Sequence, residues 1–183
     1  MSERVAGRRV AILVEEEFED SELTGPRDAL REAGAAVTLV GPVAGRQYRG
    51  KKGLVVTADL AAAAARAAEF DALVIPGGHA PDRMRLRHAM VDLARDMTQA
   101  ERPVAAICHG PQVLISAGIL NGRTVTCWPS IAIDVKNAGG HYVDRPVVVD
   151  ANLITSRKPD DIPAFCEALL AALEQSPGAD PTV

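Results

Sequence analysis

Short apolar runs alternate with amphipathic segments along almost the whole chain, and this alternation restricts the possible folds more than any other feature. Residues 9–14 (RVAILV) and 104–107 (VAAI) have the continuous apolar character of strands buried on both faces. Residues 88–101 place Met90, Leu93 and Met97 on one helical stripe. The predicted strands are 9–14, 36–40, 71–75, 104–107, 124–127, 142–149 and 153–155, and the predicted helices are 24–33, 88–101, 110–117 and 163–173. This order predicts an α/β three-layer sandwich, a mostly parallel sheet with helices on both faces.

The segment 48–57 lies outside this alternation and is typical of a small hairpin. With 183 residues the chain is long enough for one domain with a sizeable core, and we expect a single domain over 1–183. Its ordered part is expected to cover about 8–175, since the tail from Ser176 is rich in proline and glycine and should fray.

Charge and cysteine content limit the cellular compartments and the binding partners that are possible for this chain. The net charge is −4 and no basic tract is present, which argues against an obligate nucleic-acid or membrane partner. The first nine residues carry no apolar core of a secretory signal, and no stretch is long and apolar enough to span a bilayer. Three cysteines without CxxC spacing indicate a reducing compartment. We therefore expect a cytoplasmic protein.

Three of the predicted strands are followed by unusual segments. In an open parallel sheet the binding crevice lies beyond the carboxyl ends of the strands, so these segments should converge on one edge. They are the acidic run 15–22 (EEEFEDSE), the turn 76–82 (PGGHAPD) and the segment 108–110 (CHG).

Cys108 is the strongest candidate for a reactive group. It stands between an apolar strand and a helix that begins near Gly110, the context of a nucleophile elbow. The helix N-terminus should favour the thiolate and depress the pKa of Cys108. The alternative reading is a buried structural cysteine, which is how Cys127 and Cys166 are interpreted. His109 fits either an acid/base partner or a simple helix-start residue.

The other candidates lie on the neighbouring loops. Gly77 and Gly78 allow backbone N–H groups to approach an oxyanion closely, although they also fit an ordinary tight turn. In the acidic run most carboxylates must be solvated, and Glu19 is the one predicted to turn inward because Phe18 can anchor the loop beside it. The histidines show no metal-ligand spacing with each other or with the cysteines, so no metal site is expected.

Four motifs together resemble the PfpI-type intracellular protease family, and bacterial YhbO-type stress proteins within it. The similarity extends from about Arg9 to Leu173, with a further YhbO-like segment at 156–161 (SRKPDD). The four motifs are residues 17–20 (EFED), 75–82 (IPGGHAPD), 106–112 (AICHGPQ) and 134–139 (DVKNAG). The resemblance implies a class I glutamine amidotransferase-like, flavodoxin-like fold.

The resemblance also implies roles for individual residues. Cys108 would be the nucleophile, and Glu19 the buried carboxyl group that hydrogen-bonds its sulfur. The backbone N–H groups of Gly78 and His109 would form the oxyanion hole. Asp82 would approach the histidine of a neighbouring subunit in a homodimer or an assembly of dimers. It stands where the archetypal proteases carry glutamate, which puts a protease-like intersubunit triad in doubt.

The function implied is a cysteine-dependent stress-response enzyme without metal or organic cofactor. Its substrates would be reactive carbonyls or glycated adducts, as for a deglycase or glyoxalase, or peptides, as for an intracellular protease. The alternative is a non-enzymatic redox-responsive stress protein or chaperone-like holdase. A glutamine amidotransferase is disfavoured because His141 is followed by Tyr142 and Val143 rather than by a His-x-Glu pair. A Rossmann enzyme is disfavoured because no GxGxxG follows the first strand.

Overall fold

A seven-stranded sheet forms the centre of the computed structural model, which describes residues 3–178. Its strand order is β10-β11-β7-β6-β1-β2-β5. Every neighbouring pair is parallel except β10 with β11, which is antiparallel. The strands are β1 (Arg9–Leu13), β2 (Ala36–Gly41), β5 (Leu60–Ala61), β6 (Ala72–Ile75), β7 (Val104–Ile107), β10 (Val147–Asp150) and β11 (Leu153–Ser156). The expected mostly parallel sheet is confirmed.

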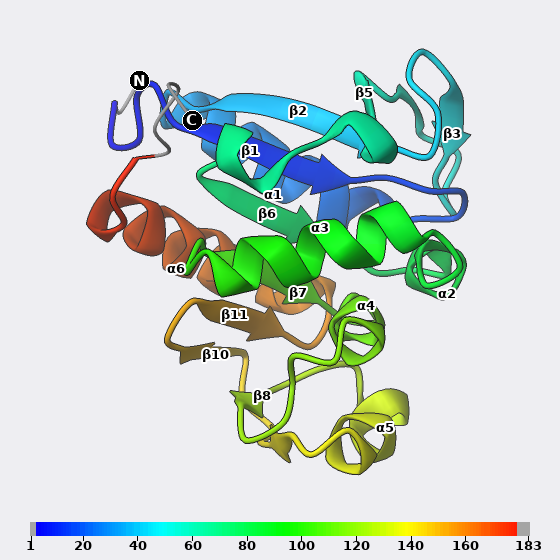
Figure 1. The fold of residues 1–183 in the computed structure, drawn as a ribbon, viewed down its shortest axis with the longest axis vertical. Coiled ribbons are helices and arrows are strands. Elements are labelled where there is room, and N and C mark those ends of the chain that lie inside the picture. Colours follow the sequence, from blue (N-terminus) through cyan, green and yellow to red (C-terminus); the bar gives the residue numbers. More distant parts are fainter. Residues whose placement is uncertain (1–2, 179–183) are drawn as a thin grey trace.

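Helices cover both faces of this sheet. α1 (Asp20–Glu32) packs against α6 (Ile162–Gln175) on one face. On the other face α3 (His88–Gln99) packs over β6 and β7 and against the short α4 (Pro111–Ser116). Figure 1 shows α3 in front of the strands and α1 behind them. The three-layer sandwich is therefore confirmed.

The central strands are buried along their whole length because both faces are covered. β6 and β7 show no exposed side chain, and residues 10–13 of β1 are equally buried. This explains why the strands appear in the sequence as continuous apolar runs instead of alternating patterns.

Two small sheets and several short elements complete the fold. The hairpin expected at 48–57 is present as β3 (Gln47–Arg49) paired with β4 (Val55–Thr57). The strand expected over 142–149 is wrong, because the chain divides there into β9 (His141–Tyr142), which pairs with β8 (Thr124–Val125), and the edge strand β10. The short helices α2 (Ala80–Met84) and α5 (Ala132–Asn137) were not predicted. The tail beyond Gly178, expected to fray, lies outside the described residues.

The first helix begins four residues earlier than expected, and this shift matters for the site. The sequence prediction started it at Thr24, whereas α1 starts at Asp20 with Glu19 as its N-cap residue. Residues 20–22, the last three of the acidic run, are therefore helical. Its inward stripe consists of Glu22, Leu23, Pro26 and Leu30.

The carboxyl ends of the parallel strands define one edge of the molecule. The arrowheads of β1, β6 and β7 point toward the side where α2 and α4 lie (Figure 1). Within residues 3–178, no helix is long and apolar enough to cross a membrane.

Candidate active site

Cys108 lies at a sharp strand-to-helix turn at the end of β7. Its φ angle is +62°, in the left-handed region that residues with a Cβ seldom adopt. The turn is fixed on both sides, because Cys108 N–H donates to the Ser156 carbonyl at 3.0 Å and the Cys108 carbonyl accepts from Trp128 N–H at 2.9 Å. Strain of this kind persists only where the surrounding structure imposes it, and it is concentrated at functional sites.

Gly110 makes this turn possible. A Cβ atom at Gly110 would lie 2.5 Å from the carbonyl oxygen of Ile75, which belongs to the neighbouring strand β6. The chain therefore passes directly over the end of β6 before α4 begins, and this path lifts Cys108 out of the sheet.

The carboxyl group beside the sulfur belongs to Glu22. This side chain is fully buried on the inward stripe of α1, and its carboxyl group faces the Cys108 thiol and raises the pKa of that thiol. Its Oε2 accepts the N–H of Gly77 at 2.8 Å. The expectation that Glu19 occupies this position is wrong, because α1 starts at Asp20 and the helix turns Glu22 toward the sheet.

Glu19 lines the same cavity from the other side. Its carboxylate lies 3.5 Å from Lys51 Nζ and 3.0 Å from Lys52 Nζ, so it is paired with the β3–β4 turn instead of the sulfur. Glu22 and Lys51 were not among the site residues predicted from the sequence. Glu22 could have been found from its helical spacing with Leu23, Pro26 and Leu30, but no local signal connects Lys51 to Cys108.

Two backbone N–H groups point at the sulfur. Those of Gly78 and His109 both act on Cys108 Sγ and oppose the rise of its pKa. Gly78 reaches this position with a φ of +82°, and a Cβ there would lie 2.5 Å from the carbonyl oxygen of Glu17. These are the two groups expected for an oxyanion hole, and the structure brings them together at the sulfur.

Burial raises the pKa of both reactive groups. It raises the pKa of Glu22 to about 7, against the opposing effect of the Gly77 N–H. Burial and the Glu22 carboxylate raise the pKa of the Cys108 thiol to about 12. The predicted depressed pKa of Cys108 is therefore wrong, because burial and the facing carboxylate raise it.

His109 can exchange a proton with the sulfur. Its Nδ1 lies 3.3 Å from Cys108 Sγ, and its Nε2 lies 3.5 Å from Ser130 Oγ. The ring stacks on Trp128 with centroids 6.1 Å apart. Burial, together with the positive charges of His79 and Lys51, lowers the pKa of His109, so its neutral form is favoured.

The cavity above the sulfur has a volume of about 280 Å³. It suits a small molecule or the end of a larger one. Its lining residues are Glu19, Glu22, Lys51, Gly78, His79, Cys108, His109, Trp128 and Pro159. Among residues 3–178 no group of three or more histidine, cysteine or acidic side chains is placed to hold a metal ion.

Asp82 lies on α2 beside a second hollow, of about 480 Å³, that adjoins the first. It is exposed, and His109 also lines this hollow. The two side chains therefore share a cavity wall within one chain, and the expected approach of Asp82 to a neighbouring subunit remains a prediction.

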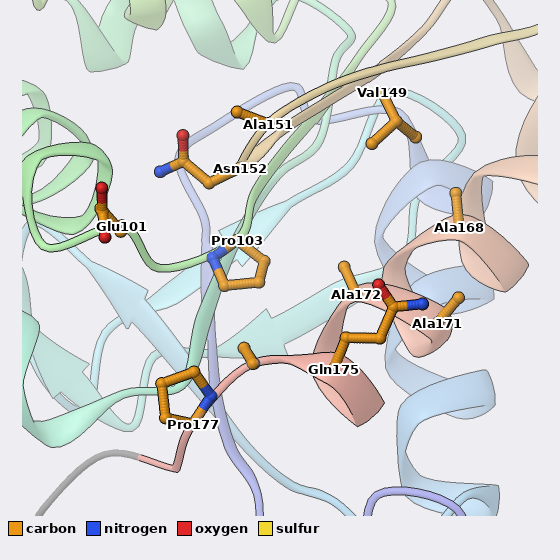
Figure 2. A pocket seen from close by; sticks show the side chains of 11 residues that line it. Glu101, Pro103, Val149, Ala151, Asn152, Ala168, Ala171, Ala172, Gln175 and Pro177 are labelled. Carbon is orange, nitrogen blue, oxygen red and sulfur yellow. The ribbon is translucent and has the colours of Figure 1, made fainter.

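A third hollow, of about 430 Å³, is lined by none of these residues (Figure 2). Its wall is formed by alanines of α6, the β10–β11 turn and Pro103, which comes just before β7. It therefore lies at the amino end of β7, opposite to Cys108, and it contains no cysteine or histidine.

An α/β sheet with a cysteine on a strained turn, a buried glutamate against the sulfur and two N–H donors defines a class of cysteine-centred proteins. The model of the DJ-1/PfpI family matches residues 8–172, and the chain belongs to this family. The sequence-based recognition of the family is confirmed.

The chain is also similar to several named proteins. The chain is 48% identical over 168 residues to protein/nucleic acid deglycase 2 of Escherichia coli, covering 91% of this chain and 98% of that protein. It is 44% identical over 171 residues to general stress protein 18 of Bacillus subtilis, covering 92% and 99%. A crystal structure of a two-domain protein from Anabaena variabilis, with DJ-1/ThiJ/PfpI-like and ferritin-like domains, superposes with a TM-score of 0.90 at 42% identity. That match covers 96% of this chain and 52% of the two-domain protein.

Proposed function

We propose that this chain is a cysteine-dependent stress-response enzyme of the cytoplasm that acts on reactive carbonyls or their adducts with amines and thiols. The observation that carries the proposal is the placement of Cys108 Sγ between the Glu22 carboxyl group and the N–H groups of Gly78 and His109. The name of the Escherichia coli relative, a deglycase, supports the same substrate class.

The first step would be attack of the Cys108 sulfur on a carbonyl carbon. The thiol proton passes to His109 Nδ1 or to Glu22, both of which contact the sulfur. The sulfur–carbon bond forms while the carbonyl π electrons move onto oxygen. The developing oxyanion lies near the Gly78 and His109 N–H groups, which are already oriented toward the sulfur.

Glu22 is suited to the proton transfers that follow. Converting a 1,2-dicarbonyl compound and water into an α-hydroxy acid needs one group that takes a proton from carbon and returns it to the neighbouring carbon. With a pKa of about 7, Glu22 can hold and release a proton near neutral pH. When it is protonated, the negative charge that raises the Cys108 pKa is also removed, so formation of the thiolate becomes easier.

Turnover by the wild-type protein and by Cys108→Ala tests the proposal. Methylglyoxal, a methylglyoxal-modified thiol and a peptide are supplied separately, with Cys127→Ala and Cys166→Ala as controls. We expect turnover of the first two substrates, loss of it in Cys108→Ala and retention of most of it in the controls. Turnover of the peptide alone would move the assignment to a protease. Undiminished activity in Cys108→Ala would instead remove the nucleophile role.

A non-enzymatic redox-responsive stress protein is the second candidate, and the similarity to general stress protein 18 favours it. It differs in one measurable respect, because such a protein would protect a client from aggregation with no turnover of any of the three substrates.

A further inference from the structure

Lys51 places a positive charge in the wall of the Cys108 cavity. Among the described residues that line this cavity, it is the only lysine or arginine. Its charge lowers the pKa of both Glu22 and His109, so it acts on the two groups that contact the sulfur.

The backbone holds Lys51 over the cavity. Its N–H donates to the Phe18 carbonyl at 2.9 Å. Phe18 in turn forms an antiparallel bridge with Gly78, whose N–H points at the sulfur. The turn that carries Lys51 and the N–H donor Gly78 are therefore both bonded to Phe18.

Asp20 fixes the rest of the turn. Its two carboxylate oxygens accept the N–H groups of Lys52 at 2.9 Å and of Leu54 at 2.8 Å. This carboxylate sits in the first turn of α1, the helix that also carries Glu22. The position of Lys51 relative to Glu22 is thus determined by two independent sets of hydrogen bonds.

The ammonium group of Lys51 is free to change partner. Its contact with Glu19 is long, at 3.5 Å, whereas Lys52 lies 3.0 Å from the same carboxylate. If Lys51 turns toward a bound molecule, Lys52 still compensates the charge of Glu19. Glu19 keeps one cationic partner, so the move avoids the main electrostatic cost of such a rearrangement.

We propose that Lys51 determines substrate specificity at this site by binding a carboxylate or an oxyanion on the carbon next to the one that Cys108 attacks. Without Lys51 the two glutamates in the wall would repel such a group. The inference rests on the proposed carbonyl chemistry for its substrate class: a 1,2-dicarbonyl unit has a second oxygen in this position, and that oxygen becomes an enediolate oxyanion when the proton leaves the attacked carbon. Lys51 would thus favour these compounds over simple aldehydes.

Alkylation of Cys108 by iodoacetate and by iodoacetamide tests this role without any turnover. The same thiolate attacks both reagents and displaces iodide, so their rate ratio cancels any change in the thiol pKa. They differ in the carboxylate that iodoacetate carries on the carbon next to the one attacked. We expect Lys51→Met to lower the iodoacetate-to-iodoacetamide ratio by about fivefold, as the loss of one close charge interaction implies.

Two further variants make the test specific. Lys51→Arg should keep the wild-type ratio, because it keeps the charge. Lys136→Met, the matched control, should stay within about twofold of wild type, because Lys136 is exposed on α5 and does not line the cavity. Peptide mass spectrometry confirms that the label is on Cys108, and added salt should reduce the difference between wild type and Lys51→Met.

An unchanged ratio in Lys51→Met would overturn the role of Lys51, even if methylglyoxal were turned over. A reduced ratio in a protein with no turnover of carbonyl substrates would support the role of Lys51 and reject the proposed function instead.

Discussion

The Glu22 carboxyl group lies against the Cys108 sulfur, and its Oε2 also accepts the N–H of Gly77 at 2.8 Å. Glu22 belongs to α1 and Cys108 follows β7, so the contact joins the layer of helices to the end of the sheet. A buried acid and a thiol in contact titrate as a pair, and the state of one decides the reactivity of the other. Most of the predictions below depend on this pair.

Replacing Glu22 by glutamine should reduce carbonyl turnover by about 100-fold or more, because the amide keeps the shape but cannot exchange a proton. Glu19→Gln is the matched control, and its activity should stay within about tenfold of wild type, since Glu19 contacts the lysines and not the sulfur. Steady-state kinetics with methylglyoxal compares the two variants. Equal losses in both would contradict the assignment of Glu22.

The same substitution should lower the pKa of the Cys108 thiol. The Glu22 carboxylate is one of the causes that raise this pKa, and glutamine carries no charge. The thiolate absorbance in the ultraviolet, titrated against pH and corrected with Cys108→Ala, measures the change. A pKa equal to that of wild type would show that the carboxylate does not act on the sulfur.

Stability should fall as the pH rises through neutrality. The pKa of Glu22 is about 7 in the folded protein, above its ordinary value of 4.5, so its protonated form is favoured by folding. This stabilising contribution of Glu22 is fully present below pH 4.5, the ordinary pKa of a glutamate, and is lost as the pH rises through 7. It amounts to about 3 kcal/mol. Urea unfolding of wild type and Glu22→Gln from about pH 4 to about pH 7.5 isolates it, because the Cys108 thiol, whose pKa also differs between the two proteins, stays protonated in this range. A pH-independent difference would contradict it.

We predict a homodimer, or an assembly built from dimers, in which Asp82 approaches His109 of the partner subunit. Leu86, which is 81% exposed, lines the hollow shared by Asp82 and His109, where contact with a second chain would cover it. Leu86→Asp should therefore weaken the assembly, whereas Ile133→Asp, at an exposed site outside this hollow, should not. Light scattering at micromolar concentration measures the mass. A wild-type monomer would remove the intersubunit role of Asp82.

Peroxide should oxidise Cys108 before Cys127 and Cys166. Burial raises the pKa of all three thiols, but of the three only Cys108 lines the cavity and has two backbone N–H groups that oppose this rise. These donors stabilise the thiolate and its oxygenated products. Peptide mass spectrometry after graded peroxide follows each cysteine. Earlier oxidation of Cys166, the most exposed of the three at 8%, would show that simple accessibility decides the order.

Several features of the site could be predicted from the sequence because they depend on local structure. The apolar run 104–107 followed by Cys108, His109 and Gly110 implies a strand, a tight turn and a helix, which is the arrangement observed. The turn at Gly77–Gly78 was predicted in the same way, and so was the convergence of strand ends on one edge of the sheet. Patterns of this kind report short-range conformational preferences, which neighbouring residues largely determine.

The identity of the buried acid was decided by the tertiary structure. Six carboxylates in eight residues look equivalent in a loop, and the distinction appears only because α1 begins at Asp20 and turns Glu22 toward Cys108. The position of Lys51 depends in the same way on the docking of the β3–β4 hairpin against Asp20 and Phe18. The raised pKa of Cys108 follows from burial, which no local pattern contains. Charges and side chains from distant segments meet only when the layers pack. The chemistry of the Glu22–Cys108 pair depends on that packing.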